Sequence, residues 1–269
     1  MCQFFSLVSD GKGKVMYFDW KLREKCLSKK LPFEPDSHTS IATHFGYEGA
    51  KEDSLNKYEY NPLTNKFEVD QLNTIDDSKY VEDFCQKLDF KLIIPQLIIK
   101  PIIHPFKIKP KKVTKADIQL LKQWDSVWAS VWDSVGDSVR DSVRDSVRAS
   151  VWDSVWDSVG YSVGGSVGGS VRDSVRDSVR DSVGASVRAS VWASVWASVR
   201  VSVWGYTSSF FNLPEWKYIK HKKGINPYQC VIDLWEKGLV PSFDGITWRL
   251  HSGKKAEIVF EITKEVLKA

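Results

Sequence analysis

The sequence predicts a mainly β protein in which a central β-solenoid of tetrapeptide repeats is flanked by two small α+β domains. The main observation is that twenty consecutive tetrapeptides of the form [Trp/Arg/Gly]-x-Ser-Val run without interruption over 124–203, where x is Asp or Ala in sixteen of them. A fixed period over such a length is typical of repeat architectures, in which each unit buries its apolar face against its neighbours. A second observation is that the segments on either side of the array combine strand-like alternation with helix-like periodicity.

Residues 1–91 are expected to form the first α+β domain. Turn residues at 10–13 and 61–65 each separate two apolar, strand-like runs, which predicts two β-hairpins. A helix is predicted between 78 and 89, because apolar residues recur there with the spacing of one helix face. These residues are Val81, Phe84, Cys85 and Leu88.

Residues 92–113 form a proline-rich connector that ends in the basic run KIKPKK. A short helix over 114–123 should follow, with Thr114 at the N-cap and Asp117 three residues later, close to a capping box. Because solenoids need covered ends, we expect this helix to cap the first coil.

Within the array, each of the four repeat positions predicts a different environment. Val is invariant and is the candidate for the core, whereas the invariant Ser is small enough for a tight corner or a hydroxyl ladder. The first position is Trp seven times, Arg eight times and Gly five times. Such swaps change volume and charge more than a core tolerates, so this position should be exposed. The second position, mostly Asp or Ala, should be small and reachable by solvent.

The period of four residues favours a β-solenoid over a helix. An α-helix has 3.6 residues per turn, so a four-residue repeat drifts by about 40° per unit and its Val stripe winds around the helix. Ser and Val are mediocre helix formers, and each glycine of the Gly-Gly pairs would destabilise a helix by about 1 kcal/mol relative to alanine. Short extended sides with inward Val would stack at the spacing of paired strands. Three or four sides per coil are both compatible with the repeat, and a distorted helical array or a disordered stretch remain the alternatives.

The last segment, 204–269, is expected to be a second α+β unit and the other cap. Asn226 at the N-cap, Pro227 at N1 and Gly238 just past the end predict a helix. Alternating runs on both sides of 252–253 predict a hairpin. Four apolar residues should pack the junction with the last coil: Phe210, Phe211, Leu213 and Trp216.

The array resembles a shortened form of the pentapeptide-repeat proteins, which are right-handed quadrilateral β-helices with one inward aliphatic residue per side. The whole chain also resembles a family of proteins from bacteriophages and their hosts. This second resemblance rests on DSHTSIATHFG at 36–46, on the Ser-Val array, and on DLWEKGLVPSFDGITWRL at 233–250. It implies no activity.

Charge and cysteine usage suggest a cytoplasmic protein, in the host cell cytoplasm if the gene belongs to a phage. The chain has a net charge of +4, whereas the array carries eight Arg against ten Asp and is slightly acidic. The four cysteines are scattered without a CxxC pair, and the N-terminus does not look like a signal peptide. The longest apolar run, LIIPQLIIKPIIH, is broken by proline and is too short to cross a bilayer. We therefore expect reduced thiols, no membrane segment and no cofactor.

Two groups of residues suggest chemistry, each with a plainer interpretation. Removal of the initiator methionine would leave Cys2 as an N-terminal thiol beside its own amine, as in N-terminal-nucleophile amidotransferases, but an incidental thiol is the expectation. His38 and His44 lie near acidic and hydroxyl residues, yet their spacing matches no standard zinc motif. Hydrogen-bonded histidines in a loop are the preferred interpretation, without a metal.

The functional hypothesis is a noncatalytic scaffold that binds a protein partner, or assembles with itself, through the Trp and Arg side chains of the array. Both residue types are enriched at binding hot spots. The alternatives are a nucleic-acid-associated protein that uses the basic flanks KIKPKK and KYIKHKK, or an N-terminal Cys hydrolase. The residues expected on the binding surface are Trp124, Trp128, Trp132, Trp152, Trp156, Trp192, Trp196, Arg140, Arg144, Arg148, Arg172, Arg176 and Arg180.

Overall fold

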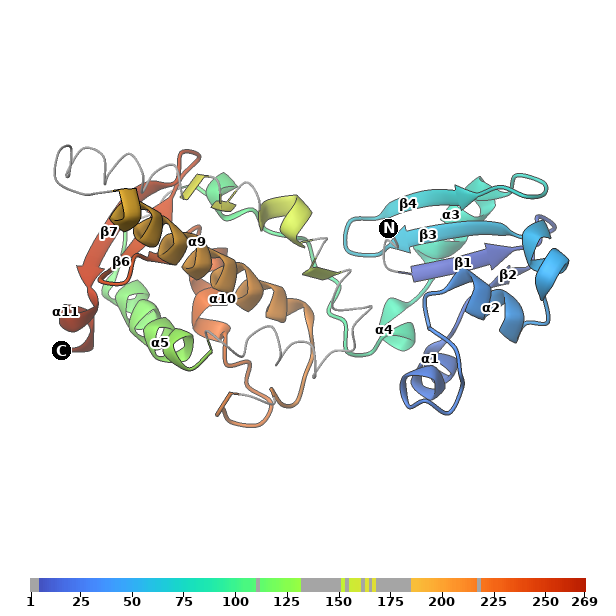
Figure 1. Ribbon diagram of the computed structural model, residues 1–269, viewed down its shortest axis with the longest axis horizontal. Helices are drawn as coiled ribbons and strands as arrows, with labels where there is room; N and C mark the ends of the chain where they lie inside the picture. The colour runs from blue at the N-terminus through green and yellow to red at the C-terminus, as the bar shows by residue number, and fades with distance from the viewer. Residues whose placement is uncertain are drawn as a thin grey trace. The chain divides into compact units, whose positions relative to one another are not determined.

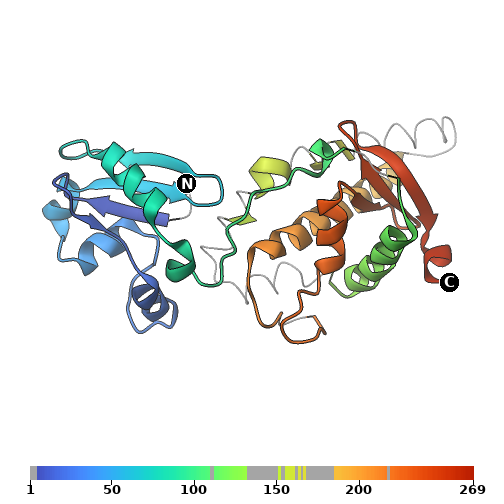
Figure 2. The same cartoon turned by 180° about the vertical axis from the view of Figure 1, so that it is seen from behind.

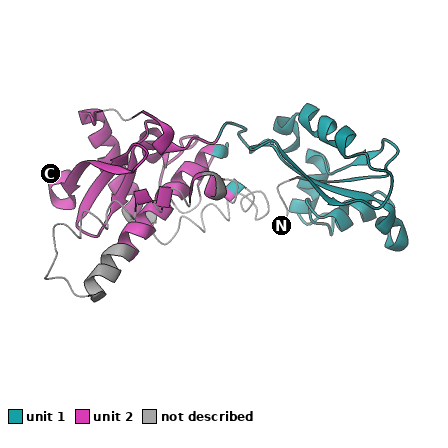
Figure 3. Ribbon diagram, turned by 90° about the horizontal axis from the view of Figure 1, so that it is seen from above, with its two compact units in different colours: residues 1–101, 143–151, 210–212 teal, residues 102–142, 152–209, 213–269 magenta. Residues whose placement is uncertain are grey.

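The structure is a computed structural model, and it describes residues 5–109, 112–131, 151–152, 155–160, 163–164, 166–167, 185–216 and 219–269. The chain divides into two compact units (Figure 3). Unit 1 contains residues 1–101, 143–151 and 210–212, and unit 2 contains residues 102–142, 152–209 and 213–269.

Unit 1 is built on a four-stranded antiparallel sheet of order β2-β1-β3-β4. The two predicted hairpins are confirmed, and they are joined in one sheet because β1 also pairs with β3. The strands are β1 (Phe5–Ser9), β2 (Val15–Met16), β3 (Asn56–Asn61) and β4 (Lys66–Gln71).

Helices cover both faces of this sheet, which explains why β1 is buried along its whole length. Helix α2 lies in front of the sheet in Figure 1, and α3 lies in front of it in Figure 2, seen from behind. The predicted helix is confirmed as α3, where Val81 and Cys85 are buried. The helices of unit 1 are α1 (Trp20–Leu27), α2 (His38–His44), the 3-10 helix η1 (Gly49–Ser54), α3 (Ser78–Lys87) and α4 (Phe90–Ile93).

The connector contains the short 3-10 helix η2 (Pro105–Lys107) and leads into α5 (Lys115–Val131). The capping box is confirmed: the Thr114 amide donates to Asp117 Oδ2 at 2.9 Å, and the Asp117 amide donates to Thr114 Oγ1 at 3.3 Å. The helix is longer than predicted, since α5 continues through the first two tetrapeptides of the array.

The rest of unit 2 consists of helices around a three-stranded antiparallel sheet of order β5-β6-β7. The predicted hairpin is confirmed. The predicted C-terminal helix ends just before Gly238, whose φ is +80°, but it begins at Gln229 with Tyr228 at the N-cap, and not with Asn226 there as expected. The short strand β5 was not expected from the sequence. The elements are α9 (Ala185–Thr207), the 3-10 helix η4 (Ser208–Phe210, which ends in unit 1), α10 (Gln229–Glu236), β5 (Val240–Phe243), β6 (Thr247–Ser252), β7 (Glu257–Thr263) and α11 (Lys264–Lys268).

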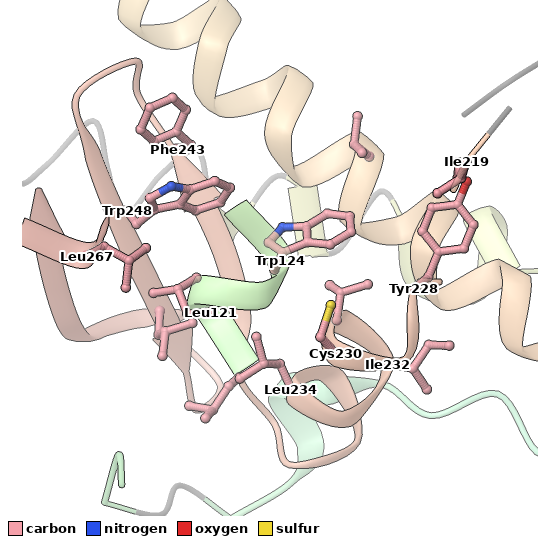
Figure 4. Packing of buried hydrophobic residues seen from close by; sticks show 14 of the residues in the cluster. Leu121, Trp124, Ile219, Tyr228, Cys230, Ile232, Leu234, Phe243, Trp248 and Leu267 are labelled. Carbon is pink, nitrogen blue, oxygen red and sulfur yellow. The ribbon is translucent and has the colours of Figure 1, made fainter. Parts of the chain in front are cut away.

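The core of unit 2 forms where α5, α10 and the sheet meet, and Figure 4 shows Trp124 of α5 at its centre. Trp124 and Trp248 are fully buried, as are Leu121 and Leu234. Helices α9 and α10 approach closely at Gly205, where an added Cβ would lie 2.5 Å from Val231 Cγ1. The array therefore contributes directly to this core.

The prediction of a central β-solenoid is wrong. The array begins inside α5 and ends inside α9, and a π-helical turn, η3 (Trp156–Gly160), lies between them. No strand occurs in the array residues for which the structure gives a conformation. Consequently α5 caps no coil, and the quadrilateral β-helix implied by the resemblance to pentapeptide-repeat proteins does not apply.

A helix accommodates both invariant residues of the repeat: the serine hydroxyls find hydrogen-bond acceptors within the helix, and the valine side chains are buried. The Ser198 and Ser202 hydroxyls each donate at 2.8 Å to the carbonyl three residues earlier in α9, so both are satisfied while fully buried. The expected burial of the invariant valines is confirmed wherever their burial is described, except at the partly buried Val127. The buried ones in unit 2 are Val155, Val159, Val163, Val167, Val195, Val199 and Val203.

Candidate binding surface

The first two tryptophans of the array belong to the core of unit 2 and not to a surface. Trp124 is 0% exposed, so the expectation of an exposed first position is wrong there. Trp128 is partly buried, with its ring 5.2 Å from the Phe243 ring and 5.7 Å from the Trp248 ring, both edge-on. The Lys264 ammonium lies 5.5 Å from the Trp128 ring centre. The Trp128 ring thus faces the sheet, whereas the Trp124 ring lies against α9, where a Cβ added at Gly205 would be 3.5 Å away.

The second position of the first repeat is also buried, contrary to the expectation that it reaches solvent. Asp125 is 2% exposed and accepts a hydrogen bond of 2.9 Å from Trp248 Nε1. Its carboxylate also lies 3.5 Å from Lys264 Nζ and 3.9 Å from Lys268 Nζ. A buried carboxylate needs such partners, and here they tie α5 to β6 and α11.

Four tryptophans lie in contact along a second stretch of unit 2, and we call them the tryptophan row: Trp152, Trp156, Trp196 and Trp204. The Trp152 ring stacks on Trp204 at 3.9 Å and on Trp156 at 4.9 Å between ring centres. Trp156 meets Trp196 edge-on at 6.4 Å. All four side chains are partly exposed. Aromatic contacts of this kind add about 0.5–1.5 kcal/mol each beyond the area that they bury.

The tryptophan row is a contact between two stretches of the same repeat. Trp152 and Trp156 come from the array segment 152–167, whereas Trp196 and Trp204 come from α9. The earlier residue of the first pair meets the later residue of the second, so the two stretches run in opposite directions. Trp204 was missed from the sequence, because the tetrapeptide pattern stops at Val203. It does continue the spacing of the first position, which was the available signal.

Glycine at the first position makes room for tryptophan on the facing stretch. An added Cβ at Gly164 would lie 2.6 Å from the Trp196 ring, closer than side chains tolerate. The first position therefore holds large and small residues that fit one another, and its variety does not mean that it is exposed throughout. Arg200, which lies between Trp196 and Trp204 in the first-position register, is exposed.

The structure thus distributes the expected binding residues among three places. Trp124 and Trp128 are in the core, and Trp152, Trp156 and Trp196 are in the tryptophan row. Trp192 is in α9, but its side chain is outside the described part of the structure. The expected residues that lie outside the described residues altogether are Trp132, Arg140, Arg144, Arg148, Arg172, Arg176 and Arg180.

The described cysteines are poor nucleophiles. Cys26, Cys85 and Cys230 are unpaired and buried. Burial raises the pKa of the Cys85 and Cys230 thiols to about 12, and it also raises the pKa of Cys26. Since the thiolate is the reactive form, these residues are unsuited to covalent catalysis. Cys2 lies outside the described residues.

The two histidines lie at opposite ends of α2, in a helix and not in the expected loop. His38 Nε2 is 3.0 Å from the carbonyl oxygen of Tyr58 in β3. The His44 ring lies edge-on to the Phe18 ring at 5.2 Å. They therefore have different partners and do not form one cluster. Among the residues that the structure describes, no three Cys, His, Asp or Glu side chains are grouped as metal ligands would be.

Unit 1 has an open cleft of about 360 Å³ between the β2–α1 corner and the α3–α4 junction. Its walls are mainly apolar, with two carboxylates and one ammonium. Both carboxylates have structural roles as helix N-caps: Asp19 accepts from the Leu22 amide at 2.9 Å and Asp89 from the Lys91 amide at 3.0 Å. The residues that line the cleft are Tyr17, Asp19, Trp20, Lys21, Leu88, Asp89, Leu92 and Ile93.

Comparison of the chain with protein-family models, curated proteins and solved structures returns no match. Among the described helices, none has the length and apolar character needed to cross a bilayer.

Proposed function

We propose that the protein is a noncatalytic binding protein and that the tryptophan row is its contact surface for another protein. The observation that carries the proposal is the partial exposure of four tryptophans that touch one another in one row. Tryptophan is the residue most enriched at protein–protein hot spots. Its rings here are already held by stacking, so a partner would order few side chains on binding.

Arg200 adds a polar element to this surface. It is exposed and lies one repeat from Trp196 and one from Trp204 in sequence. Arginine is enriched at hot spots beside tryptophan because it combines an apolar stem with a planar, multiply donating head. A protein partner with an acidic or carbonyl-rich contact patch fits this combination.

The test measures partner capture by the immobilised full chain from a lysate of the source cells, with quantitative mass spectrometry. We expect Trp156→Ala to weaken capture by about 30-fold, corresponding to the roughly 2 kcal/mol of a hot-spot residue. Arg200→Ala should also weaken it. Lys223→Ala is the matched control, since Lys223 is exposed in unit 2 and lies outside the tryptophan row.

Two further measurements decide between this proposal and its competitors. Circular dichroism and urea unfolding of each variant show whether lost capture reflects lost folding. Retention on immobilised DNA or RNA that falls steeply with salt, and that is unchanged in Trp156→Ala, would replace the proposal by nucleic-acid binding through the basic flanks. Loss of function in Cys2→Ala with silent tryptophan variants would replace it by the hydrolase hypothesis.

A further inference from the structure

The open cleft of unit 1 has the size and the walls of a small-molecule site. Its volume of about 360 Å³ falls in the range of roughly 300–1,000 Å³ in which ligand sites are found. Leu92 is 71% exposed, so part of the apolar wall faces solvent. A ligand with an apolar body would cover such a surface. The apolar and aromatic residues of the walls are Tyr17, Trp20, Leu88, Leu92 and Ile93.

Aromatic packing ties the two sides of the cleft to one ring. Tyr17, on the side of β2 and α1, lies edge-on to the Phe5 ring at 5.4 Å. Phe90, at the start of α4, lies edge-on to the same Phe5 ring at 5.1 Å. Figure 1 shows α1 and α4 next to each other. The cleft is therefore formed before a ligand binds, and binding needs little ordering of its walls.

The polar groups of the cleft favour a cation. Asp19 and Asp89 each use Oδ1 to cap a helix, and the Oδ2 atoms have no hydrogen-bond or ion-pair partner among the residues that the structure describes. Lys21, the one cation among the lining residues, forms no ion pair with a described residue. Two carboxylates against one ammonium leave the lining with a charge of about −1 at pH 7.

The aromatic rings add to this preference. The faces of tryptophan and tyrosine rings attract cations. Burial and the nearby Asp19 carboxylate raise the pKa of Tyr17, so its hydroxyl stays neutral at physiological pH. The positive end of α1 does not turn the cleft into an anion site, because the Asp19 carboxylate already caps it.

We propose that this cleft binds a small organic ammonium ion, with a primary or quaternary ammonium group on an apolar or aromatic body. The ammonium group is placed by the free carboxylate oxygens of Asp19 and Asp89 and by the ring of Trp20. The apolar body is placed by Leu88 and Leu92. The inference goes beyond the proposed function and does not rest on it, since the tryptophan row belongs to unit 2.

The first measurement compares three probes of similar shape on the full wild-type chain. Phenethylammonium is the cation, phenethyl alcohol is its neutral counterpart, and phenylacetate is an anion with a similar body. Dissociation constants come from ligand-observed NMR titrations in low salt, because the exposed carboxylates are screened at high salt. We expect saturable binding of phenethylammonium, about tenfold weaker binding of the alcohol and no binding of the anion.

The second measurement locates the site with variants that keep the fold. Asparagine is also a good N-cap, so Asp19→Asn and Asp89→Asn remove charge and retain the helix start. Each should weaken phenethylammonium binding by about fivefold, the upper end for an ion pair in contact with solvent. Trp20→Leu should weaken it about threefold. Lys21→Gln removes a repelling charge and should tighten binding about twofold.

Asp76→Asn is the matched control. Asp76 is an exposed carboxylate of unit 1 that accepts from the Ser78 amide at 2.9 Å and lies outside the cleft lining. Its replacement should leave the dissociation constant unchanged. Circular dichroism and urea unfolding show which variants are folded, and the comparison of the three probes on wild-type protein needs no variant.

Four results overturn the proposal. They are the absence of saturable phenethylammonium binding, equally tight binding of the alcohol, folded Asp19→Asn and Asp89→Asn proteins that bind like Asp76→Asn, and weaker binding by folded Lys21→Gln. Equal affinity for cation and alcohol would show an apolar cleft without preference for charge. Neither a positive nor a negative result bears on partner capture by the tryptophan row, which is measured on variants of unit 2.

Discussion

The fully buried imidazole of His251 should make unit 2 sensitive to mild acid. His251 lies on β6 and is 0% exposed. Its Nδ1 is 3.0 Å from the Ala256 carbonyl oxygen, so Nδ1 carries the proton and donates. Its Nε2, 2.8 Å from Ser242 Oγ, then accepts from the hydroxyl. Both ring nitrogens are satisfied in the neutral form, and burial lowers the pKa of His251 from 6.5 to about 4.

The sign and size of the effect follow from this lowered pKa. In the unfolded chain the imidazole becomes protonated below about pH 6.5, whereas in the folded chain it stays neutral down to about pH 4. The unfolded state therefore binds more protons in this window, and stability falls as pH falls. A shift of roughly 2.5 pH units at about 1.4 kcal/mol per unit corresponds to about 3 kcal/mol lost between pH 7 and pH 4.

The measurement is urea unfolding followed by tryptophan fluorescence, at intervals from pH 7.5 to pH 4. His251→Gln is the control, because glutamine has a donor and an acceptor but does not titrate. Asp117 and Asp244, whose pKa values are lowered in the fold, titrate in both proteins and cancel in the difference. The free energy of unfolding of the wild type should fall by about 3 kcal/mol more than that of the variant. Parallel pH curves for the two proteins would refute the reasoning.

Three other predictions concern packing and thiol reactivity. Ser198→Ala should destabilise unit 2 by about 1–3 kcal/mol in urea unfolding, because Ser198 Oγ also accepts from a buried amide of β5 at 2.8 Å. Ser202→Ala removes only a bond within the helix and should lower the free energy of unfolding by less than about 1 kcal/mol. Equal losses in the two variants would contradict a stabilising bond between Ser198 and β5. Gly164→Ala should lower the melting temperature although alanine favours helices, since its Cβ would clash with a tryptophan ring; a stabilised variant would exclude this contact. Cys85 and Cys230 should resist iodoacetamide at pH 8 until urea is added, as seen by intact mass, and rapid native labelling would show that they are not buried.

Most of the flanking elements were predictable because their signals are local. The hairpins around 10–13, 61–65 and 252–253 are set by turn residues, and the capping box at Thr114 is set by two side chains three residues apart. Strand β5 was missed because it is short and contains Pro241, which weakens a strand assignment. That strand exists because it pairs with β6 and is covered by α9, contacts that depend on residues distant in sequence.

The candidate surface was predictable in composition but not in arrangement. Tryptophan and arginine at the first position drew attention to the array, and Trp152, Trp156 and Trp196 are indeed partly exposed. Which tryptophans are buried depends on the elements packed against each repeat. Trp124 is buried because α5 lies between α10 and the sheet, a fact that identical repeats are unable to encode. Because the repeats are so alike, the sequence also did not indicate that segment 152–167 pairs with α9.

The period of four misled the fold prediction because it was compared with the α-helix alone. A four-residue step rotates about 400° in an α-helix, so the valine stripe advances by about 40°. A π-helix has about 4.4 residues per turn, so the same step rotates about 327° and the stripe moves back by about 33°. A single π turn inserted in an α-helix therefore offsets the drift of about one neighbouring repeat. Turn η3 covers Trp156–Gly160, and the valines at, before and after it, Val155, Val159 and Val163, are all buried. A tetrapeptide repeat is thus compatible with a helix whose valine face stays inward and whose first-position residues continue to meet those of α9.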